Sequence, residues 1–302
     1  MKIKFGAIAM AFVCAISLDT ASAQIIDNRL GTAFKEEMYF NHEFLWQNKI
    51  RTITVVTSIK RPNRPIEPRP DIIVYRFNDV GLLQQIDKVS SVSSLVDSLT
   101  IEFKRNDVGE VELRTENGNH GYKTTRFNYD NSGKLVRLDY GSSQNISSQK
   151  NVLEPGRSIT VNSETFAYSE GGPGITRKSN YNNYGLLYSN ETTTRNELGY
   201  VLSDVEELVM SNKTTTREYE YTDKGWVKEI TTTVNTEGKP KSEKFFYDEV
   251  GNLLKVEYYT EDFLTRELEI LYTDTFLIEA MLDHDPVSHD IIIRKFSYEI
   301  KS

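Results

Sequence analysis

Cysteine is almost absent from this chain of 302 residues. The single cysteine, Cys14, lies within an N-terminal segment that carries the features of a cleaved export signal. The remaining chain therefore has neither a disulfide bond nor a thiol nucleophile. Its fold must be held by a core, and its length is ample for one.

Positive charge is also in short supply. The chain has 36 Lys and Arg against 44 Asp and Glu, which gives a formal net charge of −8. Nucleic acid is disfavoured as a partner, because phosphate binding needs clustered Lys and Arg. With 38% apolar and 11% aromatic residues, the composition indicates a folded globular protein.

Long apolar runs are absent except at the start of the chain. Lys2 and Lys4 precede the apolar stretch from Phe5 to Leu18, and a small-residue cleavage site ends at Ala23. This order predicts a secretory signal peptide over residues 1–23. As a helix the stretch spans about 21 Å, short of the roughly 30 Å hydrocarbon core. The mature chain is then expected to start at Gln24, in the periplasm or outside a bacterium, without a transmembrane segment.

Motifs of catalysis are missing as well. The sequence has no Gly-x-Ser-x-Gly, no His-Glu-x-x-His and no P-loop. We therefore predict no enzyme activity, no catalytic residue and no cofactor.

Glycine recurs in a fixed context. Eight four-residue units open with Asn, Asp or Thr and end with Gly. They begin at residues 78, 106, 130, 182, 196, 222, 235 and 248. The opening side chain accepts a backbone N–H of a type I turn, and Gly takes the left-handed conformation that closes a bulged hairpin.

This turn geometry predicts which residues face each other. The residue before each turn pairs with the second residue after Gly, so Tyr129 faces Leu135 and Tyr247 faces Leu253. One position further out, the same counting puts Glu220 opposite Lys228 and Phe246 opposite Leu254. Aromatic residues opposite aliphatic ones are favourable cross-strand pairs, worth roughly 0.2–1 kcal/mol each.

Spacing indicates a repetitive architecture. Turn glycines 13 residues apart leave about nine residues of strand, and Ser-Asn-Glu-Thr-Thr-Thr-Arg at 189–195 returns as Ser-Asn-Lys-Thr-Thr-Thr-Arg at 211–217. The doubled gap before Gly225 predicts a further turn near 211–213. Each strand is expected to lie beside the next.

The units at 127–135 and 246–253 resemble YD repeats, the units of Rhs-type secreted bacterial proteins. The segments 219–227 and 75–83 are looser copies. The resemblance implies β-hairpin repeats in an exported protein. The arginine usual after the glycine is absent, and the chain is far too short for a closed toxin-enclosing shell, so the resemblance implies no catalytic residue.

The fold class predicted is all-β: a long, twisted antiparallel meander, curled or partly closed, which covers its apolar face with its own ends. A closed barrel and a two-sheet sandwich are the alternatives. Residues 49–60 and 290–300 are expected at the sheet edges, and a short helix within 30–46. The expected organisation is a signal peptide (1–23), an N-terminal segment with one strand and a proline-rich connector (24–70), and the β domain (71–302).

Two sets of residues are candidate sites. His284, Asp285 and His289 lie close enough in sequence to bind a divalent cation, although a polar turn between two strands is the favoured explanation. Trp226 and Tyr200 follow turn glycines and are expected on the face opposite Val227 and Val201, where exposed rings suit a sugar or a peptide.

These observations favour a non-catalytic binding or scaffold protein of the bacterial envelope, with a protein or a glycan as its partner. An added partner strand at a free sheet edge is the expected route of binding. One alternative is a secreted glycan hydrolase that uses a carboxylate pair. Another is a component of a toxin-delivery or immunity system.

The export signal generates the first prediction. Mass spectrometry of the protein from its native envelope fraction should give an N-terminus at Gln24, because the small residues before it suit signal peptidase. Retention of Met1 in that fraction would contradict the predicted localisation.

Overall fold

The computed structural model describes residues 24–35, 40–92, 95–118, 121–144, 146 and 156–301. The predicted signal peptide, with Cys14, lies outside these residues.

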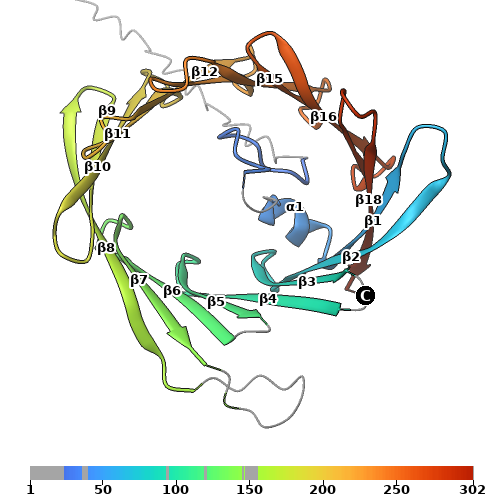
Figure 1. The fold of residues 1–302 in the computed structure, drawn as a ribbon, viewed down its shortest axis with the longest axis horizontal. Coiled ribbons are helices and arrows are strands. Elements are labelled where there is room, and N and C mark those ends of the chain that lie inside the picture. Colours follow the sequence, from blue (N-terminus) through green and yellow to red (C-terminus); the bar gives the residue numbers. More distant parts are fainter. Residues whose placement is uncertain are drawn as a thin grey trace, which may run out of the picture.

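The described chain forms one closed β-barrel (Figure 1). Its eighteen strands are all antiparallel, and each pairs with the next along the sequence. The strands are β1 (Ile50–Lys60), β2 (Ile66–Phe77), β3 (Leu83–Val92), β4 (Leu95–Arg105), β5 (Val111–Gly118), β6 (Gly121–Tyr129), β7 (Leu135–Ser143), β8 (Ile159–Gly172), β9 (Ile175–Tyr181), β10 (Leu187–Arg195), β11 (Val201–Leu208), β12 (Thr214–Tyr221), β13 (Val227–Val234), β14 (Lys241–Tyr247), β15 (Leu253–Thr260), β16 (Phe263–Tyr272), β17 (Ile278–His284) and β18 (Ile291–Ile300). The all-β meander, including the turn near 211–213, is confirmed.

The barrel closes where β1 meets β18. These strands pair from Ile50 opposite Ile300 to Lys60 opposite Ile291. The expectation that residues 49–60 and 290–300 lie at free edges was therefore wrong, and no edge among the described strands is open to a partner strand. The twist of successive strands accumulates around the sheet and brings its ends together.

Seven of the eight turn units form the predicted turn and set the register, up to one residue. The unit at 235 differs, because Glu237 donates its N–H to the carbonyl of Val234 and the pairing of β13 with β14 stops at Thr232 opposite Lys241. Tyr129 is opposite Leu135 and Tyr247 is opposite Leu253. A β-bulge then inserts one residue, so Phe246 faces Lys255 rather than Leu254.

An equivalent bulge in the hairpin of β12 and β13 changes the predicted pairing of Glu220 with Lys228. Glu220 is opposite Glu229 in the register, yet Lys228 still reaches Glu220 at 3.2 Å.

The proline-rich segment contributes strand as well as turn. Residues 66–70 belong to β2, where Pro68 lies opposite Ser58 beside a shift in register. Proline lacks a backbone N–H, and an irregular position of this kind tolerates it.

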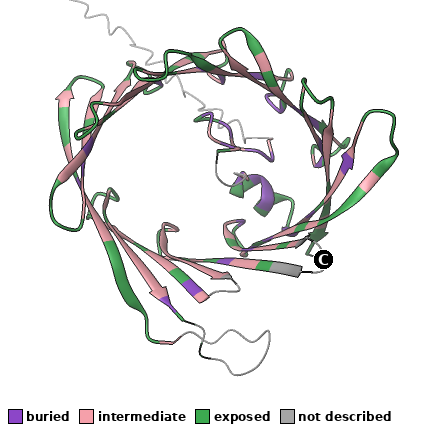
Figure 2. Ribbon diagram, in the orientation of Figure 1, coloured by how far each residue is buried: buried purple, intermediate pink, exposed green. Residues whose placement is uncertain are grey.

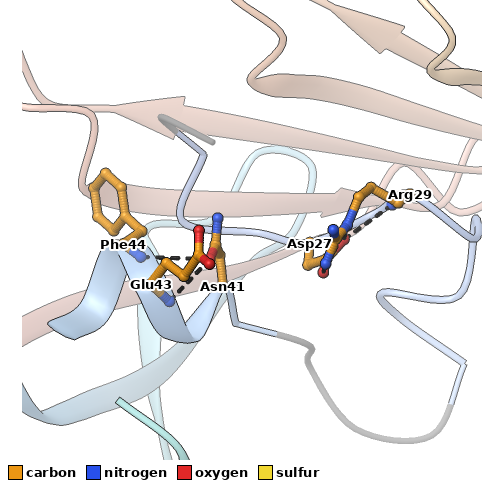
Figure 3. Close-up of polar contacts among 5 residues, drawn as sticks. All are labelled: Asp27, Arg29, Asn41, Glu43 and Phe44. Atoms are coloured by element: carbon orange, nitrogen blue, oxygen red, sulfur yellow. Dashed lines mark hydrogen bonds and ion pairs between the residues drawn. The ribbon is translucent and has the colours of Figure 1, made fainter. Parts of the chain in front are cut away.

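The N-terminal segment, described over residues 24–35 and 40–48, lies inside the ring (Figure 1). Ile26 bridges to Phe40, and the predicted short helix is present as α1 (His42–Gln47). Asn41 caps this helix, because its side-chain oxygen accepts the backbone N–H groups of Glu43 and Phe44 (Figure 3).

The main core lies between this segment and the inner wall of the barrel (Figure 2). From the segment come Ile25, Ile26 and Leu45, each at most 1% exposed. The wall contributes Ile53, Ile86, Val227, Ile230, Val256, Leu268 and Met281. Each such side chain contributes about 1.5–3 kcal/mol by burial. The N-terminal segment, rather than the sheet's own ends, thus covers the apolar face.

A ladder of tyrosine hydroxyls joins neighbouring hairpins. Tyr247, the residue before its turn, donates its hydroxyl hydrogen bond to the carbonyl of Val227, the second residue after the preceding turn glycine, at 2.9 Å. Five other tyrosines make the equivalent bond at 2.8–3.0 Å: Tyr129 to Val111, Tyr168 to Leu135, Tyr221 to Val201, Tyr272 to Leu253 and Tyr298 to Ile278.

These hydroxyls replace backbone hydrogen bonds. The pairing of β13 with β14 begins only at Glu229 opposite Lys244, so the carbonyl of Val227 lies beyond the paired region and the Tyr247 hydroxyl satisfies it. Asn28 donates to the same hydroxyl at 3.0 Å, which attaches the N-terminal segment to the ladder. Burial raises the pKa of Tyr247 to about 12, so the hydroxyl stays protonated and able to donate.

The ladder generates the second prediction. Tyr247→Phe should lower the free energy of unfolding by roughly 1–2 kcal/mol, because it leaves a buried carbonyl without a donor. Urea denaturation of the mature protein measures this loss. Tyr184→Phe is the matched control, since Tyr184 lies in a turn and is 81% exposed. Equal stabilities of the two variants would contradict a stabilising ladder.

Candidate functional site: the cavity in the barrel lumen

The sequence-predicted metal candidates lie in the turn between β17 and β18. The rings of His284 and His289 stack with centroids 6.1 Å apart. Asp285 accepts the backbone N–H groups of Val287 at 2.8 Å and Ser288 at 3.2 Å, as a turn-forming residue does. No group of three potential metal ligands occurs among the residues that the structure describes.

The predicted exposed rings, Trp226 and Tyr200, pack against other tyrosines. Trp226 lies 5.3 Å from the Tyr247 ring and Tyr200 lies 4.9 Å from the Tyr221 ring, between centroids. Trp226 also lies against Gly251 and Tyr200 against Gly225, in each case the glycine of the next turn at this end of the barrel. A methyl group on either glycine would clash with the ring. In these positions the two rings stabilise a row of turns.

A cavity of about 410 Å³ opens in the lumen between the N-terminal segment and strands β10 to β12. Leu30 and Thr32 line it from the segment. From the strands it is lined by Glu191, Thr193, Arg195, Val201, Asp204, Val205, Glu206, Arg217, Tyr219 and Tyr221. A concave site that combines apolar walls with several polar groups is the usual form of a small-molecule site.

Asp204 is held firmly in the wall of this cavity. It accepts hydrogen bonds from the hydroxyls of Thr193 at 2.6 Å and Tyr219 at 2.9 Å, one on each carboxylate oxygen. Burial, and then the neighbouring carboxylate, raise the pKa of Tyr219. The Tyr219 hydroxyl therefore stays protonated and keeps Asp204 in a fixed orientation.

Glu191 is held in a similar way. One of its oxygens accepts from Lys178 at 3.1 Å and from Asn180 at 2.7 Å. Arg195 donates to the carbonyl of Gly199 at 3.2 Å. These charged groups of the cavity thus have protein partners.

Arg217 and Glu206 differ from them. Neither makes a hydrogen bond or ion pair with any residue in the described part of the chain. Arg217 is opposite Asp204 in the register, and Glu206 is two residues further along β11. Side chains two apart share a face, so both point into the lumen with Asp204.

A second charged cluster lies further around the lumen wall. The Asp283 carboxylate accepts hydrogen bonds from Nε and Nη2 of Arg266 at 2.7 and 2.8 Å, and from Nη1 of Arg294 at 3.1 Å. Burial alone raises the pKa of Asp283, but the two guanidinium groups outweigh it and leave the pKa below its ordinary value. Arg266 and Arg294 also line a smaller cavity of about 190 Å³ beside Phe34.

Glu243 lies between these two regions, on β14. Burial raises its pKa, and the positive charges of Lys35, Arg217 and Arg266 oppose this only in part. The lumen wall from β12 to β18 is therefore lined with charges of both signs.

The outer wall carries its own ion pairs. Arg137 contacts Asp139 at 2.6 Å, and Lys255 contacts Glu257 at 2.5 Å. Within the described residues, no helix is both long and apolar enough to cross a membrane.

Sequence reasoning did not single out the cavity residues. Asp204 and Arg217 lie in alternating strand segments, and Arg217 ends one of the Thr-rich repeats. The sequence indicates only which residues of each strand share a face, through their spacing of two. The register between β11 and β12 is also needed to place Asp204 opposite Arg217.

No protein-family model matches the chain, and no curated protein matches its sequence. Solved structures give similarities of fold. A porin-like protein from Bacteroides uniformis shows 9% identity, covers 83% of this chain and 97% of its own, and has a TM-score of 0.41. TcdB2-TccC3 without its hypervariable C-terminal region shows 13% identity over 70% of this chain and 12% of its own, at a TM-score of 0.29.

A LolA superfamily protein from Nitrosomonas europaea shows 10% identity over 85% of this chain and 91% of its own, at a TM-score of 0.19. These identities and scores are too low to carry a functional inference.

The Asp283 cluster generates the third prediction. Asp283→Asn should cost roughly 2–3 kcal/mol of unfolding free energy at pH 7, because two guanidinium groups lose their shared charged acceptor. A carboxyl whose pKa is lowered on folding stabilises the fold above its unfolded pKa of about 3.9, and this stability is lost as the pH falls through the folded value. The difference from the parent should therefore shrink towards about pH 3.

Urea denaturation at both pH values measures this difference. Asp139→Asn, at the exposed Arg137 pair, is the control and should cost less than about 1 kcal/mol. A pH-independent deficit at Asp283 would contradict the assigned ion pairs.

Proposed function

We propose that this chain is an exported, non-catalytic protein of the bacterial envelope that binds a small polar ligand inside its barrel. The observation that carries the proposal is the cavity of about 410 Å³ between the N-terminal segment and β10 to β12. Leu30 is 60% exposed there, although it lies within the ring, so the cavity has an apolar wall that no protein group covers.

The placement of the carboxylates supports binding rather than catalysis. A general acid or base needs a proton that it can exchange with the substrate. Asp204 instead accepts from Thr193 and Tyr219, and Glu191 accepts from Lys178 and Asn180. Carboxylates fixed in this way are poorly suited to proton transfer, and the third carboxylate of the cavity, Glu206, therefore has no free carboxylate partner among the described residues with which to form a catalytic pair.

Export is supported by the sequence and by the form of the hairpins. The apparent signal peptide directs the chain out of the cytoplasm, and charged pairs on the outer wall suit an aqueous compartment such as the periplasm. The turn units resemble YD repeats of secreted bacterial proteins. The tyrosine ladder gives the tyrosine of such a unit a physical role, because its hydroxyl links one hairpin to the previous one.

Ligand binding can be tested with the mature protein, residues 24–302. Its thermal unfolding is followed with glucose, maltose, inorganic phosphate and each of the twenty amino acids as probes. At least one probe should raise the Tm in a concentration-dependent way, because a ligand that binds only the folded state stabilises it.

A blocking variant assigns that effect to the cavity. Leu30→Trp should abolish it, because a larger ring at this position fills the site. Leu198→Trp is the control, since Leu198 lies in the turn between β10 and β11 and is 81% exposed. A ligand effect that survives Leu30→Trp, or no effect of any probe, would contradict lumenal binding. Release of reducing ends from a glycan would contradict a non-catalytic role.

A further inference from the structure

Two opposite charges in the cavity make no direct polar contact within the described part of the chain. Arg217 and Glu206 both line it, and neither has a hydrogen-bond or ion-pair partner among the described residues, although the charge of Arg217 acts at longer range on Glu243. They lie on adjacent strands and on the same face, where Glu206 is opposite Thr215, two residues from Arg217, and they form no ion pair with each other. Partly buried charges without partners are costly, which makes them good indicators of a ligand.

The remaining charges of the cavity are already engaged. Asp204 has a hydrogen bond on each oxygen, Glu191 is paired with Lys178, and Arg195 donates to a backbone carbonyl. The groups open to a ligand are thus one guanidinium and one carboxylate. The apolar surface of Leu30 and the Tyr219 ring lie in the same cavity.

We infer that the cavity binds a zwitterion of the α-amino acid type, either a free amino acid or a short peptide. Its carboxylate pairs with Arg217, whose forked donors match a carboxylate. Its ammonium group pairs with Glu206, and an apolar side chain rests against Leu30 and Tyr219. This inference rests on the proposed function, because it names the ligand class of the same cavity.

Ligands with one charge or none fit the cavity less well. A simple anion would satisfy Arg217 but would bring a second negative charge close to Glu206 and Asp204. A simple amine would satisfy Glu206 and leave Arg217 desolvated without a partner. A neutral sugar would leave both charges without a counter-charge.

The test uses isothermal titration calorimetry on the mature protein with three related probes. L-Phenylalanine carries both charges, phenethylamine only the ammonium group, and 3-phenylpropionate only the carboxylate. If L-phenylalanine is not among the amino acids that raise the Tm, the best of the twenty and its own decarboxylated and deaminated analogues replace this series. The zwitterion should bind about tenfold or more tighter than either analogue, since each lost charged contact corresponds to about one factor of ten.

Variants assign each charge to its residue. Arg217→Gln should remove the preference for L-phenylalanine over phenethylamine, which lacks the carboxylate. Glu206→Gln should remove the preference for L-phenylalanine over 3-phenylpropionate, which lacks the ammonium group. Arg177→Gln and Glu207→Gln are the matched controls, because both residues are exposed and point to the outer wall next to lumenal positions. These controls should leave all three affinities unchanged.

A double variant with exchanged charges distinguishes a lost ligand contact from a general loss of folding. The double variant Arg217→Glu with Glu206→Arg should recover part of the binding that each single reversal loses, because the ligand can turn around. Recovery would show that the charges act on the ligand, and no recovery in a folded double variant would overturn the assignment.

The other outcomes separate this inference from the proposed function. If glucose, maltose or phosphate binds in a manner sensitive to Leu30→Trp, while no amino acid binds, the zwitterion is overturned and lumenal binding stands. If no probe binds and Leu30→Trp changes nothing, both are overturned.

Discussion

The hydrogen bond from a tyrosine hydroxyl to a backbone carbonyl of the previous hairpin is the interaction on which this barrel depends. At one end of the barrel, neighbouring hairpins stop pairing with each other before they reach their turns. The pairing of β13 with β14 stops at Glu229 opposite Lys244, which leaves the carbonyl of Val227 without a backbone donor. Tyr247 and its equivalents supply that donor. Tyrosine hydroxyls thus supply the hydrogen bonds between neighbouring hairpins that the backbone does not make. At β18, Tyr298 makes the same bond to Ile278 next to the closing strand pair.

The N-terminal segment determines what the inside of the barrel can do. It covers the apolar inner wall with residues such as Ile25 and Leu45, and Asn28 attaches it to the tyrosine ladder. The same segment supplies Leu30 and Thr32 to the cavity, so the site exists only where the segment meets β10 to β12. The N-terminal segment therefore contributes both to the packing of the core and to the lining of the cavity. A change that loosens the segment would alter both.

Turn chemistry was the part of the fold that the sequence predicted well. Each unit opens with Asn, Asp or Thr and ends with Gly, and this pattern predicted the positions of hairpin turns. It also predicted that Tyr247 lies opposite Leu253. The turn at Thr273–Phe276 is not among the eight units that end in glycine, because Phe276 takes the positive φ of 61° that glycine has in the other units. Closure was not predictable from local residues, since it depends on twist summed over eighteen strands. The position of Asp204 opposite Arg217 was not predictable either, because a slip of one residue would move either side chain to the outer wall.

The enclosure of the N-terminal segment has a consequence for the order of assembly. Asn28 finds its partner, Tyr247, 219 residues later in the chain, and β1 finds β18 only when the final strand is present. Contacts so distant in sequence carry a large loop-closure entropy and slow the folding of a chain. The N-terminal segment therefore lacks its partners until the last strands have formed. During that interval the chain exposes its apolar inner face, and such exposure makes a partly folded chain prone to aggregation.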